Sequence, residues 1–177
     1  MELSLQIANS SDIKFVFHLL VEGAKKARYS STLKKPLEAK RAAESWILNN
    51  EDMKTGNKAE VFIIMFEDKK IGVIALASFN AFPDLKEIGV FSISAAYQKK
   101  GLARKALEVL LNNLEPFDIK AKCHPASKEF ANLLTTSGFI QQSTCSETNA
   151  KYFKKYRKLS APSNIYTGMQ IIQKSLI

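Results

Sequence analysis

The stretch that decides the fold is residues 87–107, EIGVFSISAAYQKKGLARKAL. Its first part, up to Ile93, is mostly apolar and is typical of a strand. Its last part, from Ala103 onward, has leucines at helical spacing, which predicts a helix over residues 103–114. A strand therefore leads through a short polar loop directly into a helix.

The start of this helix is basic, with no acidic residue between Ser94 and Leu107. The bases are Lys99, Lys100, Arg104 and Lys105. A helix N-terminus has unpaired N–H groups and about half a positive charge, so basic side chains are unfavourable there. A bound anion removes the conflict, and Gly101, which lacks a Cβ, lets the backbone approach a phosphate. Charge alone leaves open both an anion site and a solvated basic helix start.

The bulk composition fits one globular domain spanning residues 1–177, with 46% hydrophobic residues. Two cysteines, Cys123 and Cys145, do not suggest a disulfide framework. With no signal-like or membrane-spanning apolar run, we expect a soluble cytoplasmic protein, a monomer or homodimer without membrane contact. The net charge of +9 favours anionic partners without choosing among them.

Alternation and helical periodicity predict the element order β-α-α-β-β-β-α-β-α-β-β. Strands are expected at residues 3–8, 61–66, 71–79, 88–93, 117–123, 139–143 and 165–174. Helices are expected from residue 13 to about 27, after Pro36, and at residues 103–114 and 127–137. This pattern predicts an α/β fold with a mixed, mostly antiparallel sheet of about seven strands and about four helices.

The loop at the helix start resembles a known signature. Gln98-Lys99-Lys100-Gly101-Leu102-Ala103 is similar to the (Q/R)-x-x-G-x-(G/A) motif of the GNAT superfamily of N-acetyltransferases. The strand before it, the helix after it and Gly138-Phe139 at the end of the next helix also match. The resemblance covers essentially the whole chain and is strongest over residues 86–139. It implies a GNAT-like fold and transfer of acetyl from acetyl-CoA to a primary amine by direct attack, without a covalent enzyme intermediate.

The resemblance also implies which residues bind the cofactor. The pyrophosphate would be held around the signature by Gln98, Lys99, Lys100, Gly101, Leu102, Ala103 and Arg104. The preceding strand would splay from its neighbour, so that main-chain groups of Phe91 and Ile93 pair with the pantetheine arm. The N–H of Ile93 would polarise the thioester carbonyl, which is a large catalytic contribution when the donor is preorganised.

Glu87 is the candidate general base, because family members that acetylate histones place a glutamate at this separation. It lies six residues before Ile93, so strand alternation predicts that both side chains share a face. The alternative is an ordinary polar residue at a strand start. Ser127 stands where the family has an asparagine and is expected to cap its helix and contact the cofactor. Leu134 occupies the usual position of a tyrosine acid, so that acid is missing.

The remaining candidates concern the acceptor side. Cys123 and His124 are neighbours on a strand and should point to opposite faces, which argues against a nucleophile–base pair and assigns Cys123 to packing. No His, Cys, Asp and Glu cluster has metal-ligand spacing, so no metal is expected. By topology the acceptor, a small amine or a protein amine, should be lined by the loop at residues 79–85 and by Tyr29, Ser30, Ser31 and Thr32.

A second basic run, KYFKKYRK at residues 151–158, interleaves bases with aromatic residues. Such a run is typical either of a solvated connector between the last two strands or of an RNA-binding segment. The alternative function is therefore an RNA-directed GNAT protein that acetylates aminoacyl-tRNA or binds tRNA. Nucleic acid is the less favoured partner.

Overall fold

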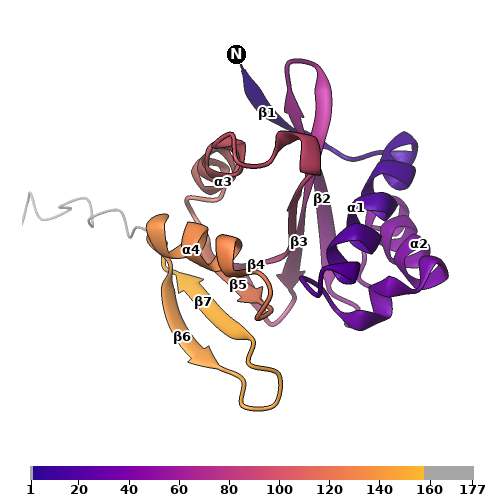
Figure 1. Ribbon diagram of the computed structural model, residues 1–177. Helices are drawn as coiled ribbons and strands as arrows, with labels where there is room; N and C mark the ends of the chain where they lie inside the picture. Colours follow the sequence, from indigo (N-terminus) through magenta and orange to yellow (C-terminus); the bar gives the residue numbers. More distant parts are fainter. Residues whose placement is uncertain (1, 158–177) are drawn as a thin grey trace, which may run out of the picture.

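The computed structural model describes residues 2–157 and contains one mixed sheet in the strand order β1-β2-β3-β4-β5-β7-β6 (Figure 1). The strands are β1 (Leu3–Ile7), β2 (Lys58–Phe66), β3 (Lys69–Phe79), β4 (Phe82–Ile93), β5 (Asp118–Cys123), β6 (Ile140–Thr144) and β7 (Lys151–Lys155). Neighbouring strands pair antiparallel except β4 and β5, which run parallel. The predicted α/β class and element order are confirmed.

Helices cover the two faces of the sheet in pairs, with α1 and α2 on one side and α3 and α4 on the other (Figure 1). Their bounds are α1 (Ile13–Lys25), α2 (Pro36–Glu44), α3 (Leu102–Asn113) and α4 (Lys128–Thr136). Each pair closes its own apolar core. Val16 and Ala43 are buried in the α1–α2 core, whereas Leu107 and Leu134 are buried in the α3–α4 core. The sheet therefore separates two compartments. None of the helices in the described part of the chain is long and apolar enough to cross a lipid bilayer.

Two predicted connections differ from the structure. The run at residues 151–157 is not a connector, because β7 inserts between β5 and β6 and buries Phe153 in the α3–α4 core. The strand predicted at residues 165–174 lies outside the described residues. The predicted loop at residues 79–85 is instead a tight hairpin in which Phe79 pairs with Phe82 across a turn at Asn80 and Ala81.

A β-bulge at Gly89 changes which side chains share a face of β4. Ala75 on β3 pairs with Val90, but the next residue, Leu76, pairs with Ile88, so Gly89 has no partner on β3. Because the bulge adds one residue to β4, the side chains beyond it point to the opposite face from that expected for a regular strand. Ile88 accordingly faces the α3–α4 core, and Val90 faces the α1–α2 core.

The expectation that Glu87 and Ile93 share a face is therefore wrong. Glu87 pairs with Lys120 on the α1–α2 side, while Ile93 belongs to the α3–α4 core. The bulge places the candidate base and the side chain of the candidate oxyanion donor in different compartments.

Candidate active site where β4 and β5 part

The two parallel strands at the centre of the sheet separate partway along their length. Their pairing covers only residues 85–88 of β4 and residues 118–121 of β5. Beyond Ile88, the edge of β4 that faces β5 has no strand partner within residues 2–157. The splay expected from the resemblance is present in this structure.

Main-chain groups of Phe91 and Ile93 point into this opening. The N–H of Ser94 donates to the carbonyl of Ile71 on β3 at 2.8 Å. In an antiparallel ladder alternate residues face alternate neighbours, so Phe91 and Ile93 face away from β3. Their carbonyls are already occupied, because the Tyr29 hydroxyl donates to Phe91 at 3.0 Å and the Gln98 side-chain amide donates to Ile93 at 2.7 Å. Each carbonyl thus already accepts one hydrogen bond, whereas no described residue accepts from the two N–H groups, which are free to bind a ligand.

Tyr29 ties the segment between α1 and α2 to this edge. Its ring lies against Gly23 of α1, where an added Cβ would stand 2.2 Å from the ring atom Cε2. Burial raises the pKa of Tyr29 to about 12, so the hydroxyl keeps its proton and stays a donor. The partly buried ring therefore fixes the segment between α1 and α2 against β4.

The signature loop forms a cradle of unused N–H groups. Gly101 is the N-cap of α3 with a left-handed φ of 76°, and Lys99 has a φ of 60°. No side chain caps the helix, and no main-chain N–H from Lys99 to Arg104 donates to another described residue. Nothing lies within 4 Å of the position of a Cβ on Gly101. An open row of N–H groups beside several bases fits a diphosphate.

The side chain of Ser127 does not cap α4, contrary to expectation. Ser127 is the N-cap residue, but its side chain makes no capping hydrogen bond. It is buried, and its hydroxyl donates to the carbonyl of Arg28 at 3.4 Å, which links α4 to the α1–α2 segment. Leu134 is fully buried in the α3–α4 core, so no hydroxyl stands at that position. Phe130 stacks on Phe91 with a centroid separation of 5.1 Å and forms an apolar wall beside the splay.

A cavity of about 260 Å³ lies on the α1–α2 side of the sheet. Tyr29, Ser30 and Thr32 line it as predicted, whereas Ser31 and residues 79–85 do not. Glu87 and His124 are on its wall. Small side chains from α2, β2 and β3 leave this space open, namely Ala42, Ala59, Ala75 and Ala77.

Two titratable groups of this cavity can take a proton. The Glu87 carboxylate lies 3.1 Å from the Lys120 ammonium. Burial, helped by the charge of Lys122, lowers the pKa of His124, so the imidazole is neutral near pH 7. Sequence patterns pointed to His124 only as a neighbour of Cys123. Its position directly after a strand parallel to the signature strand was the signal that could have identified it.

Cys123 lies on the other face from His124, as predicted. It is buried in the α3–α4 core, and burial raises the pKa of its thiol to about 12. A thiol in this state is a poor nucleophile.

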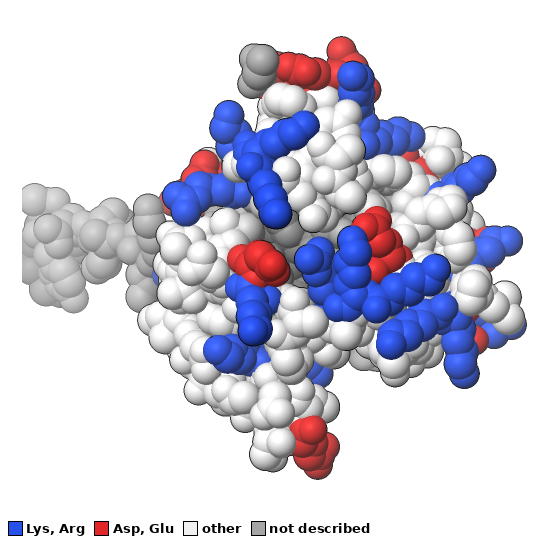
Figure 2. Space-filling model, viewed as in Figure 1, with Lys and Arg blue, Asp and Glu red and all other residues white. Residues whose placement is uncertain are grey.

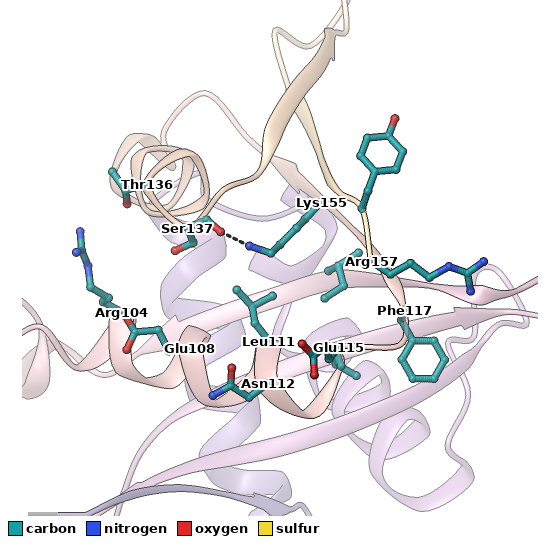
Figure 3. A pocket seen from close by; sticks show the side chains of 13 residues that line it. Arg104, Glu108, Leu111, Asn112, Glu115, Phe117, Thr136, Ser137, Lys155 and Arg157 are labelled. Atoms are coloured by element: carbon teal, nitrogen blue, oxygen red, sulfur yellow. Dashed lines mark hydrogen bonds between the residues drawn. The ribbon is translucent and has the colours of Figure 1, made fainter. Parts of the chain in front are cut away.

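A second cavity, also about 260 Å³, runs along α3 toward the C-terminal end of α4 (Figure 3). Arg104 is the signature residue that lines it, and Glu108 and Glu115 supply carboxylates. Lys155 donates to the carbonyl of Ser137 and so satisfies the C-terminal end of α4. Bases and acids alternate here, so this cavity has less net attraction for phosphate than the cradle.

Comparison with known proteins agrees with this architecture. The family model described as Acetyltransferase (GNAT) family matches residues 26–132, which is more than half of the chain. No curated protein matches the sequence significantly.

Several solved structures share the fold. RimL, a ribosomal L7/L12 alpha-N-protein acetyltransferase in complex with coenzyme A, has a TM-score of 0.70 at 14% identity over 88% of this chain and 94% of that one. The aminoglycoside acetyltransferase AAC(6')-Ib, in complex with ribostamycin and coenzyme A, has a TM-score of 0.68 at 16% identity over 89% and 94%. An acetyltransferase from Thermus thermophilus has a TM-score of 0.68 at 13% identity over 88% and 97%. The chain belongs to the GNAT family of acetyltransferases.

Proposed function

We propose that this protein transfers an acetyl group from acetyl-CoA to a primary amine by direct attack within a ternary complex. The observation that carries the proposal is the presence of two sets of free N–H groups on one strand–loop–helix segment. The first set belongs to Phe91 and Ile93 at the splay, and the second to the loop from Lys99 to Arg104. Family membership and structural neighbours in complex with coenzyme A support the same cosubstrate.

The signature loop and the splayed edge of β4 bind different parts of acetyl-CoA. The loop N–H groups and the bases Lys99, Lys100 and Arg104 hold the pyrophosphate, and Gly101 permits its close approach. The N–H of Phe91 pairs with the pantetheine arm. The N–H of Ile93 donates to the thioester carbonyl oxygen and stabilises the charge that develops there.

The acceptor enters from the cavity on the α1–α2 side and needs a base, because an ammonium is not a nucleophile. Glu87 accepts the proton, directly or through water, from its place on the cavity wall. His124, neutral on the same wall, is a second acceptor for that proton. Since Leu134 offers no acid, the thiolate leaves without a protein proton donor at that position. The buried thiol of Cys123 forms no acyl intermediate.

Binding and turnover together test this function. Calorimetry should detect coenzyme A binding to the purified protein, and free-thiol release should accelerate when an acceptor amine is added. Gly101→Glu should abolish binding, because it adds bulk and negative charge at the phosphates. Gly56→Glu is the matched control, since Gly56 also has a left-handed φ, of 65°, but lies outside the cradle. Equal affinity of the two variants would contradict the assigned site.

The RNA-directed alternative has weaker support, because the chain uses the bases of residues 151–157 internally. Lys154 pairs with Asp118 at 3.1 Å and Arg157 with Asp84 at 2.9 Å, while Lys155 satisfies α4. These contacts leave little charge in this run for a phosphate backbone.

A further inference from the structure

We infer that the acceptor carries a carboxylate close to its reacting amine, so that the substrate is an amino acid or the amino terminus of an acidic peptide and not a polyamine. This inference rests on the proposed function and concerns the acceptor cavity on the α1–α2 side. It follows from how the acids and bases of that cavity are paired.

Every carboxylate on the cavity wall already has a partner. Glu38 lies 3.6 Å from Arg41, and Glu87 lies 3.1 Å from Lys120. Asp52 accepts the indole N–H of Trp46 at 3.0 Å with one oxygen and main-chain N–H groups of its own turn with the other. Glu38 and Glu87 thus face cationic partners, whereas Asp52 keeps its negative charge because its hydrogen-bond donors are neutral.

The bases on the same wall are not neutralised. Arg28, Lys54 and Lys122 line the cavity, and none has an ion-pair partner within residues 2–157. In the space-filling view, Lys and Arg side chains gather around the centre of this face, with Asp and Glu side chains among them (Figure 2). These three bases outnumber Asp52, the one acid of the described lining without a cationic partner, so the cavity presents a net positive charge to whatever enters it.

This charge acts on the acceptor in two ways. It repels a polycation such as an aminoglycoside, and it lowers the pKa of the incoming ammonium, which increases the fraction of neutral nucleophile. A carboxylate near the amine offsets the repulsion and positions the substrate. The alanines at positions 42, 59, 75 and 77 leave apolar space for an aliphatic side chain beside the amine.

Two rings on the sheet near the cavity already carry lysine side chains. The Lys120 ammonium lies 4.2 Å from the centroid of Phe79, and that of Lys122 lies 5.4 Å from the centroid of Tyr152. Bases of single-stranded nucleic acid bind by stacking on free aromatic faces. At Phe79 and Tyr152, a lysine competes with such stacking, and the test below includes a nucleotide ester for this reason.

Matched acceptors test the inference in the free-thiol assay. Three peptides begin with leucine, continue with three Glu, three Gln or three Lys residues, and end in a C-terminal amide. Four small acceptors are compared with them: free leucine, leucinamide, kanamycin and the leucyl ester of AMP. We expect kcat/KM to fall by at least about tenfold from Glu to Lys peptides, since several partly screened charge pairs each contribute a few-fold. A preference for leucine over leucinamide would identify the α-carboxylate as the source, and a preference for the Glu peptide would identify peptide side chains.

Charge-removal variants connect the preference to the cavity. Arg28→Gln, Lys54→Gln and Lys122→Gln should each reduce the ratio of kcat/KM between Glu and Gln peptides. Lys14→Gln, which removes the same charge from the exposed side of α1, should leave that ratio unchanged. Added salt should reduce the preference as well.

The outcomes separate this inference from the proposed function. Loss of coenzyme A binding in calorimetry would defeat the proposed function itself. With coenzyme A bound, the inference is overturned by Lys peptides or kanamycin reacting as well as Glu peptides, by a preference for the AMP ester, or by no acceptor reacting at all.

Discussion

Removing the hydroxyl of Tyr29 tests how the acceptor loop is held against β4. Tyr29→Phe keeps the ring that packs on Gly23 but deletes the 3.0 Å hydrogen bond to the carbonyl of Phe91. A net hydrogen bond contributes about 1 kcal/mol, and the loss should lie near that value because water can reach the freed carbonyl from the splay. For a chain of this size the melting temperature should fall by about 2–4 °C.

The same variant should change how stability depends on pH. Burial raises the pKa of Tyr29 from 10.0 to about 12 in the folded state. A raised folded-state pKa gives a contribution that is complete below the unfolded-state pKa and is lost as the pH rises through the folded-state value. The native chain should therefore lose up to about 1.4 kcal/mol more than Tyr29→Phe between pH 8 and 11.

Urea unfolding at pH 8, 10 and 11 measures both effects. Tyr156→Phe is the matched control, because Tyr156 is 53% exposed and its hydroxyl makes no hydrogen bond within residues 2–157. If Tyr29→Phe and Tyr156→Phe unfold alike at every pH, the reasoning about the Tyr29 hydroxyl is refuted.

Three further variants address the base, the loop and the thiol. Glu87→Gln should lower turnover most at low pH, where the acceptor amine is most protonated. Glu60→Gln, which changes another ion-paired glutamate, is its control. Turnover of Glu87→Gln equal to that of the native chain from about pH 6 to 9 would remove Glu87 from the mechanism. Gly23→Ala should destabilise by about 1–3 kcal/mol in urea unfolding, because the clash with Tyr29 exceeds the helix-propensity gain, and unchanged stability would contradict that packing. Cys123→Ala should lower the free energy of unfolding by about 1 kcal/mol and leave the rate of coenzyme A release unchanged. A folded but inactive variant would show that the Cys123 thiol takes part in catalysis.

Local patterns in the sequence predicted the elements well because each element encodes its own periodicity. Residues 103–114 show the leucine stripe of α3, and the apolar runs of the central hairpin need no distant information. The anion cradle is equally local, since Gly101 and its neighbouring bases lie within one loop. The strand β7 was missed because Lys and Arg dominate a run in which Phe153 alone is deeply buried.

Contacts between distant segments were beyond such reasoning. Tyr29 and Phe91 are 62 residues apart, and Ser127 and Arg28 are 99 apart, so no periodicity reveals either hydrogen bond. The bulge is an intermediate case. An isolated glycine inside a strand pattern is a known sign of a bulge, and Gly89 was that sign, but the alternation argument for Glu87 assumed a regular strand.

The extra residue at Gly89 has an evolutionary consequence. Before it, β4 turns Glu87 toward the acceptor cavity; beyond it, the side chains of Phe91 and Ile93 belong to the opposite compartment. Substitutions that retune one chamber therefore need not disturb the other. The bulge at Gly89 therefore lets one strand contribute to two chambers whose linings can change independently.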